Sequence, residues 1–148
     1  MSKKHTGRAV RGSQFHLQNL IEFDQERLNN EILNNCPSLK AWISTSPVWV
    51  SPLAEENYEE YQDRSFLRKV NCLEVYPQLK EFRPRRGPVW DGLATLSGAN
   101  RAKGVLLLEA KSHLNEVMNL NYACKASPKS REKIGLSLEK VKKELGVN

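Results

Sequence analysis

Apolar side chains recur at helical spacing between residues 14 and 34, and this pattern predicts one long helix there. Ser13 is suited to cap its amino end. Pro37, just beyond two asparagines and a cysteine, marks its end. Residues 1–12 show no such periodicity. We therefore expect a flexible basic arm followed by a single domain over residues 13–148.

The middle of the chain mixes several patterns. Apolar side chains in residues 39–53 are interrupted by Pro47 and Pro52, which predicts an irregular or edge segment, since proline cannot donate to a sheet ladder. A second helix is predicted over residues 55–70, where aromatic and apolar residues share one face. Residues 71–82 are predicted to form a linker with one helical turn.

Two strands joined by a turn are predicted in the second half of the chain. Residues 83–88 are rich in proline and arginine and form a rigid, basic lead-in. Strands are expected over residues 89–96 and 105–111, with a turn over residues 97–104. The four apolar residues that open the second strand are typical of a strand buried on both faces.

The carboxyl-terminal part of the chain is predicted to be helical. A short helix or turn is expected over residues 114–120. Ser127 and Pro128 are a good amino-terminal pair for a last amphipathic helix over residues 128–145. The whole pattern predicts an α/β fold in which helices flank a small mixed sheet with a central hairpin.

Composition narrows the class of protein. The chain has 148 residues, of which 39% are hydrophobic, so it can build one core. Charged residues make up 27%, which argues against global disorder. No apolar run approaches about 18 residues and none follows the basic start, so neither a transmembrane helix nor a secretory signal is expected. We therefore expect a cytoplasmic protein that does not bind membranes, with three scattered cysteines in the reduced state.

The net charge of +6 is unevenly distributed. Residues 1–20, 79–103 and 121–148 each carry +4, whereas residues 21–78 carry −5 and residues 104–120 carry −1. Basic stretches thus flank a short segment that holds a carboxylate. Cations beside a carboxylate suit a phosphodiester substrate, but solvated surfaces give the same pattern, so charge alone does not decide.

Asp91, Glu109 and Lys111 are charged residues in strands that are otherwise apolar. Glu109 and Lys111 are two apart and so share one face of their strand. A hairpin centred near residue 100 pairs positions equally distant from it, which sets Asp91 opposite Glu109. Their Cβ atoms would then be about 5 Å apart.

Opposed carboxylates repel each other, and a divalent cation resolves that conflict. Mg²⁺ or Mn²⁺ takes one or two carboxylates and leaves its other positions to water and phosphate. Two simpler interpretations stay open. Asp91-Gly92 is also a strong turn signal, and Glu109 with Lys111 is also an ordinary ion pair at the end of a strand.

These residues resemble a known family. The segment from Gly87 to Asp91, followed by Gly104-Val-Leu-Leu-Leu-Glu109-Ala-Lys111, is similar to the motif of the PD-(D/E)XK nuclease superfamily, which has a restriction-endonuclease-like fold. Pro88-Val-Trp-Asp91 stands where the family has Pro-Asp. The resemblance covers residues 55–145, and because the family core continues into a further strand, this chain resembles a shortened member or an amino-terminal portion.

The resemblance implies a role for each motif residue. Asp91 and Glu109 would be metal ligands and Lys111 the cation that positions the attacking water, with Mg²⁺ or Mn²⁺ as cofactor. The family also often uses a glutamate on the helix before the first motif strand. Glu60 is the best-placed candidate, with Glu59 and Asp63 as rivals.

The function expected from the resemblance is metal-dependent hydrolysis of phosphodiester bonds in nucleic acid, with DNA as the favoured partner. The alternative is a non-catalytic nucleic-acid-binding or interaction protein that retains the fold. An open sheet edge would also allow a homodimer. The candidate phosphate contacts are Arg83, Arg85, Arg86 and Lys103.

Overall fold

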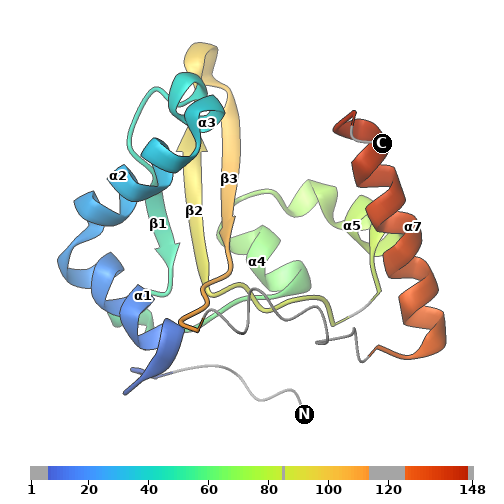
Figure 1. The fold of residues 1–148 in the computed structure, drawn as a ribbon, viewed down its shortest axis with the longest axis horizontal. Coiled ribbons are helices and arrows are strands. Elements are labelled where there is room, and N and C mark those ends of the chain that lie inside the picture. Colours follow the sequence, from blue (N-terminus) through green and yellow to red (C-terminus); the bar gives the residue numbers. More distant parts are fainter. Residues whose placement is uncertain (1–6, 85, 114–125, 147–148) are drawn as a thin grey trace.

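The structure is a computed structural model that describes residues 7–84, 86–113 and 126–146. In these residues the fold is mixed α and β: a three-stranded antiparallel sheet of order β1-β2-β3 has helices against both faces (Figure 1). The strands are β1 (Val48–Ser51), β2 (Gly92–Ser97) and β3 (Lys103–Leu108). The helices are α1 (Gly12–Phe23), α2 (Gln25–Asn35), α3 (Pro37–Trp42), α4 (Asp63–Lys69), α5 (Tyr76–Phe82) and α7 (Pro128–Glu144), with 3₁₀ turns η1 (Ala54–Glu56), η2 (Leu73–Val75) and η3 (Ala99–Arg101).

The predicted mixed α and β class is confirmed, but the sheet over the described residues is antiparallel rather than mixed. None of the helices in the described part of the chain combines the length and apolar character that a membrane crossing requires.

Strand β2 is the centre of the core. Leu93 and Ala94 are both fully buried, and as neighbours on a strand they point to opposite faces of the sheet. Ala94 packs with α1, α2 and Trp49, whereas Leu93 packs with α4 and the residues that follow it. The strand buried on both faces is therefore β2. The sequence predicted burial on both faces for strand β3 instead. Strand β3 is an edge strand of the described sheet, and its Leu107 is 40% exposed.

The hairpin formed by β2 and β3 has the predicted register, from Gly92 opposite Leu108 to Ser97 opposite Lys103. Its tip is covered by Trp42 of α3. A Cβ atom added to Gly98 would lie 2.6 Å from the Trp42 ring, so only glycine fits this close approach. The tryptophan fixes how α3 meets the tip of the hairpin.

The single long helix predicted over residues 14–34 is in fact two helices, α1 and α2. Asp24 separates them with a non-helical conformation (φ −146°, ψ 47°), and its N–H closes α1 by donating to the Leu20 carbonyl at 3.0 Å. A straight helix of that length would extend about 30 Å and project beyond the sheet, whose strands extend about 20 Å. The bend lets Leu17 and Leu28 pack into one cluster.

The helix predicted over residues 55–70 was wrong in its first half. After η1, Asn57 and Tyr58 have positive φ values of 53° and 54°, and two consecutive left-handed residues interrupt a right-handed helix. Tyr58 turns its ring inward, and its hydroxyl donates to Glu22 at 2.7 Å. The chain then pairs through Tyr61 with Trp90, and α4 begins only at Asp63.

The predicted cap Ser13 was wrong, because α1 begins at Gly12 and its flanking residue is Arg11, which makes no side-chain capping bond. The remaining predictions are confirmed in part. The irregular or edge segment over residues 39–53 holds the end of α3 and the edge strand β1, and the linker over residues 71–82 is mostly helical. Helix α7 begins as predicted, with the Ser127 hydroxyl accepting from the Ser130 N–H at 3.4 Å. The predicted helix over residues 114–120 lies outside the described residues.

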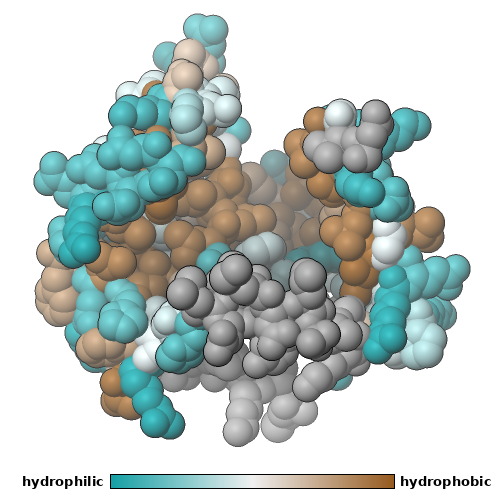
Figure 2. All heavy atoms as spheres, in the orientation of Figure 1, coloured by the Kyte–Doolittle hydropathy of each residue, from teal (hydrophilic) through white to brown (hydrophobic). Residues whose placement is uncertain are grey.

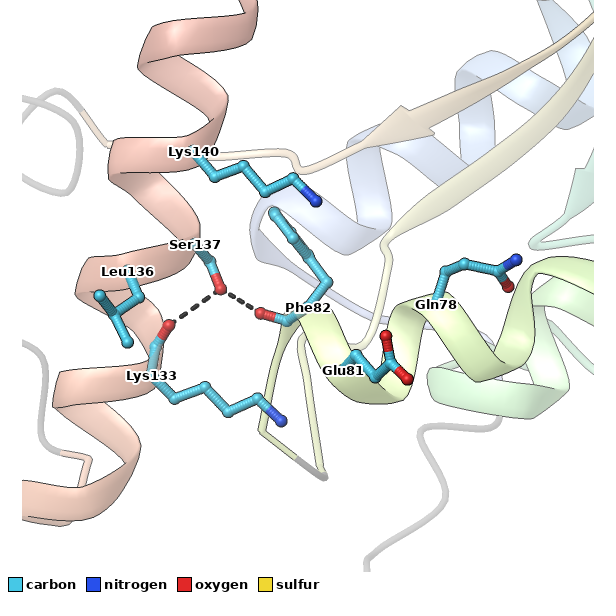
Figure 3. A pocket seen from close by; sticks show the side chains of 7 residues that line it. All are labelled: Gln78, Glu81, Phe82, Lys133, Leu136, Ser137 and Lys140. Atoms are coloured by element: carbon cyan, nitrogen blue, oxygen red, sulfur yellow. Dashed lines mark hydrogen bonds between the residues drawn. The ribbon is translucent and has the colours of Figure 1, made fainter.

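Helix α7 rests on α5 (Figure 3). The Ser137 hydroxyl donates to the Phe82 carbonyl, and Lys133 Nζ donates to the Lys80 carbonyl at 2.7 Å. Leu138 and Leu145 remain 59% and 71% exposed. Figure 2 shows the molecule from the same side as Figure 1, with apolar side chains gathered at its centre, between the helices at the left and α7 at the right.

Candidate functional site

The candidate site lies where three extended segments meet at one end of the sheet. The β2–β3 ladder ends with Gly92 opposite Leu108, so the next positions in the same register are Asp91 and Glu109. On the other side of Asp91, the antiparallel bridge between Tyr61 and Trp90 puts Glu60 next in register. Asp91 thus occupies the middle segment, with Glu60 and Glu109 on its two sides.

Electrostatics supports this arrangement. The pKa of Glu60 is raised from 4.5 to about 7, mainly because burial disfavours the charged form. A hydrogen bond from Gln14 opposes the shift, and the negative charges of Asp91 and Glu109 add to it. Asp91 and Glu109 therefore both lie close enough to Glu60 for their charges to disfavour its ionisation.

Asp91 is tied to the neighbouring strand. Its Oδ2 accepts a hydrogen bond from the backbone N–H of Ala110 at 2.7 Å, and the residue is half-buried. This bond links the residue before β2 to the chain after β3, just beyond the last ladder pair of Gly92 with Leu108. The interpretation of Asp91-Gly92 as a hairpin turn was wrong, because Gly92 opens β2 and the turn lies at residues 98–102.

Glu109 and Lys111 follow the last residue of β3 and lie together, as the strand spacing predicted. Lys111 Nζ donates to Glu109 Oε1, and the side chains are 39% and 45% exposed, respectively. Lys111 therefore places a positive charge at the exposed side of the carboxylate cluster, within reach of a ligand that arrives from solvent.

Glu60 is brought to the site, but not by the helix that the sequence predicted. It lies in the extended segment between Tyr58 and α4. Gln14 of α1 donates from Nε2 to Glu60 Oε1 at 2.6 Å. Sequence reasoning missed Gln14, because a glutamine one position after a predicted helix cap carries no signal that it contacts a residue 46 positions later.

The rivals of Glu60 lie in other surroundings. The Asp63 carboxylate accepts hydrogen bonds from Arg83 Nη2 and from the backbone N–H of Arg86, each at 3.0 Å. These bonds anchor the chain that follows α5 to the start of α4. Glu59 is half-buried, and its carbonyl accepts from the Ser51 hydroxyl at 2.8 Å.

The predicted phosphate contacts lie in different environments. The Arg83 side chain is only 12% exposed and is held by Asp63 against the Phe66 ring, which leaves little of it for a ligand. Arg86 is exposed. Lys103 is exposed but lies at the tip end of β3, about 20 Å along the strand from Glu109. Arg85 lies outside the described residues.

The residues present can be compared with what a divalent cation requires. Among the described residues, no group of three or more His, Cys, Asp or Glu side chains is arranged to hold a metal ion. Mg²⁺ is usually held by only one or two carboxylates together with water and substrate phosphate. The carboxylates of Asp91 and Glu109, which take the next positions in register after the last pair of the hairpin, fit that smaller requirement.

A scan against family models, a search of curated proteins and a search of solved structures each find no match to this chain.

Proposed function

We propose that this chain is a metal-dependent nuclease-like protein that hydrolyses phosphodiester bonds of nucleic acid, DNA being the favoured substrate. The observation that carries the proposal is the meeting of Glu60, Asp91 and Glu109 on three neighbouring extended segments, with Lys111 paired to Glu109. A cluster of carboxylates with one cation at its exposed side is what a metal-assisted attack on a phosphate requires.

The roles follow from charge and position. Asp91 and Glu109 would hold Mg²⁺ or Mn²⁺, which when bound supplies positive charge for the phosphate and activates water. The Lys111 ammonium would donate to a phosphate oxygen or orient the attacking water. Its pairing with Glu109 keeps it at the site before a substrate arrives.

The resemblance to the PD-(D/E)XK superfamily supports the same proposal. That resemblance implies an aspartate on one strand and a Glu-x-Lys on the next. In this chain Asp91 precedes β2, and Glu109 and Lys111 follow β3, at the same end of one hairpin. A restriction-endonuclease-like core is accordingly part of the proposal.

The test is cleavage of plasmid and single-stranded DNA in Mg²⁺ or Mn²⁺. We compare the wild type with Lys111→Ala and Asp91→Asn, and use Lys142→Ala on the exposed side of α7 as the matched control. Cleavage that is lost in both site variants and in EDTA, but kept in Lys142→Ala, supports the nuclease and its site. Circular dichroism checks that each variant is folded. Equal cleavage by the wild type and Lys111→Ala would indicate a contaminating nuclease and refute the site.

The binding alternative has one observation in its favour, namely that the described residues hold no ready group of three metal-ligating side chains. Under this alternative the protein would bind DNA in EDTA with an affinity that falls steeply with salt. It would then cleave in neither metal. Salt-dependent binding, measured by fluorescence anisotropy at two salt concentrations, together with no cleavage in either metal would favour this alternative over the nuclease.

A further inference from the structure

A pocket opens beside Lys111, between α1 and the end of β3. Its volume is about 390 Å³. The floor is aliphatic and is formed by Leu17, Leu20, Leu28 and Leu108. Polar groups occur at the rim, where Ser13 and His16 of α1 face the chain after β3.

The pocket continues the candidate site. Lys111 lines the pocket and also donates to Glu109, so the same side chain borders both. Gln14 lies on the same helix turn as Ser13 and His16 and binds Glu60. Helix α1 therefore forms one wall of the pocket and also contacts the carboxylate cluster.

We propose that this pocket binds the base of a nucleotide whose phosphate lies at Lys111, so that the substrate is a single-stranded or unpaired strand. The proposal rests on the proposed function for the position of the phosphate. A nucleobase is a flat apolar body with polar edges, which matches an aliphatic floor with a hydroxyl and an imidazole at the rim. The cation of Lys111 complements the phosphate.

A base-binding pocket would give the site a preference for unpaired strands. A base in a duplex is stacked and paired, so it can enter a pocket walled by a helix only after it leaves the stack. A single-stranded nucleotide has no such cost beyond modest stacking. The pocket therefore selects against continuous duplex DNA, a distinction that the motif residues alone do not make.

The first test measures binding without cleavage. In EDTA, deoxythymidine 5′-monophosphate is compared with deoxyribose 5-phosphate, which lacks only the base, and amide shifts are followed by NMR. We expect shifts at His16 and Leu20 with the nucleotide only, and tighter binding than the sugar phosphate by about 10-fold, from the apolar surface that the base buries on the aliphatic floor. Equal binding of the two, or shifts confined to other parts of the chain, would overturn the proposal.

Variants test the pocket itself. Leu20→Trp fills it and should remove the preference for the nucleotide, whereas Leu138→Trp adds the same side chain to the exposed part of α7 and should not. Should Leu20→Trp fail to fold, His16→Ala at the exposed rim takes its place and should weaken nucleotide binding severalfold. Unchanged binding in the folded variant would refute the pocket.

The second test uses cleavage and separates the two proposals. The substrate is a single-stranded oligonucleotide with or without one abasic position, incubated in Mg²⁺. Cleavage that fails or shifts next to the abasic position supports the pocket, and uniform cleavage refutes it while the nuclease stands. If nothing is cleaved, the nuclease proposal fails, and the nucleotide binding measured in EDTA still decides the pocket.

Discussion

Replacing Glu60 with glutamine should stabilise the folded protein at alkaline pH. The Glu60 carboxyl is half-buried and its pKa is raised to about 7, mainly by burial, with further contributions from the charges of Asp91 and Glu109. Its ionisation is therefore unfavourable in the folded state. Glutamine has nearly the same shape, carries no charge, and can still accept the hydrogen bond from Gln14.

The magnitude follows from the pKa. Because one pKa unit corresponds to about 1.4 kcal/mol, a rise from 4.5 to about 7 costs the folded state at most about 3.5 kcal/mol when Glu60 is ionised. Glu60 is only half-buried, so solvent screening reduces this to about 1–2 kcal/mol. For a chain of this length, the melting temperature of the variant should rise by about 3–8 °C at pH 8.

The pH dependence has a definite sign. A carboxyl whose folded pKa lies above its unfolded value binds more protons in the folded state between the two values, so the free energy of unfolding falls as pH rises from 4.5 to about 7. The advantage of Glu60→Gln should be absent below pH 4.5, grow across this window and stay constant above it. Urea unfolding in EDTA from pH 4 to pH 8.5 measures it.

The control is Glu74→Gln, the same substitution made at an exposed position of the turn η2. A difference between Glu60→Gln and the wild type that is flat with pH, or a variant that is less stable at pH 8, would refute the placement of Glu60 beside Asp91 and Glu109.

Three further perturbations test other parts of the structure. Millimolar Mg²⁺ at pH 8 should raise the melting temperature of the wild type but not of Asp91→Asn, because only the wild type offers both carboxylates; equal shifts would place any metal elsewhere. Gly98→Ala should cost about 1–3 kcal/mol in urea unfolding, since its Cβ would lie 2.6 Å from the Trp42 ring. Asp63→Asn should cost about 1–3 kcal/mol, because it leaves the largely buried Arg83 guanidinium without its anion. Hydrogen exchange should then be faster at the amides of Arg86 and Gly87, which donate to Asp63, and unchanged exchange there would contradict the anchoring role.

The hairpin could be predicted from the sequence because its signals are local. The Gly98 and Asn100 turn separates two apolar runs, and side-chain alternation then fixes which residues share a face. Register follows from the position of the turn, so the pairing of Asp91 with Glu109 could be predicted from the residue numbers alone.

The placement of Glu60 could not be predicted because its causes are not local. The helical pattern over residues 55–70 is interrupted by the positive φ values of Asn57 and Tyr58. That conformation is favoured because the buried Tyr58 hydroxyl reaches Glu22 and Arg8, which precede it by 36 and 50 positions. Single-sequence periodicity contains nothing about such contacts, and the same limit concealed Gln14.

Stability and metal affinity should be coupled at this site. Burial is the main cause of the raised pKa of Glu60, and repulsion from Asp91 and Glu109 adds to it. A cation placed among the carboxylates relieves that repulsion, so part of the free energy of metal binding is its loss. Glu60→Gln removes the repulsion in advance. At pH 8 the variant should therefore be more stable than the wild type without metal, yet gain less from saturating Mg²⁺. Because ionised Glu60 is the cause, the two proteins should gain equally near pH 5. A gain from Mg²⁺ that is the same in both proteins at pH 8 would show that the cation binds away from Glu60.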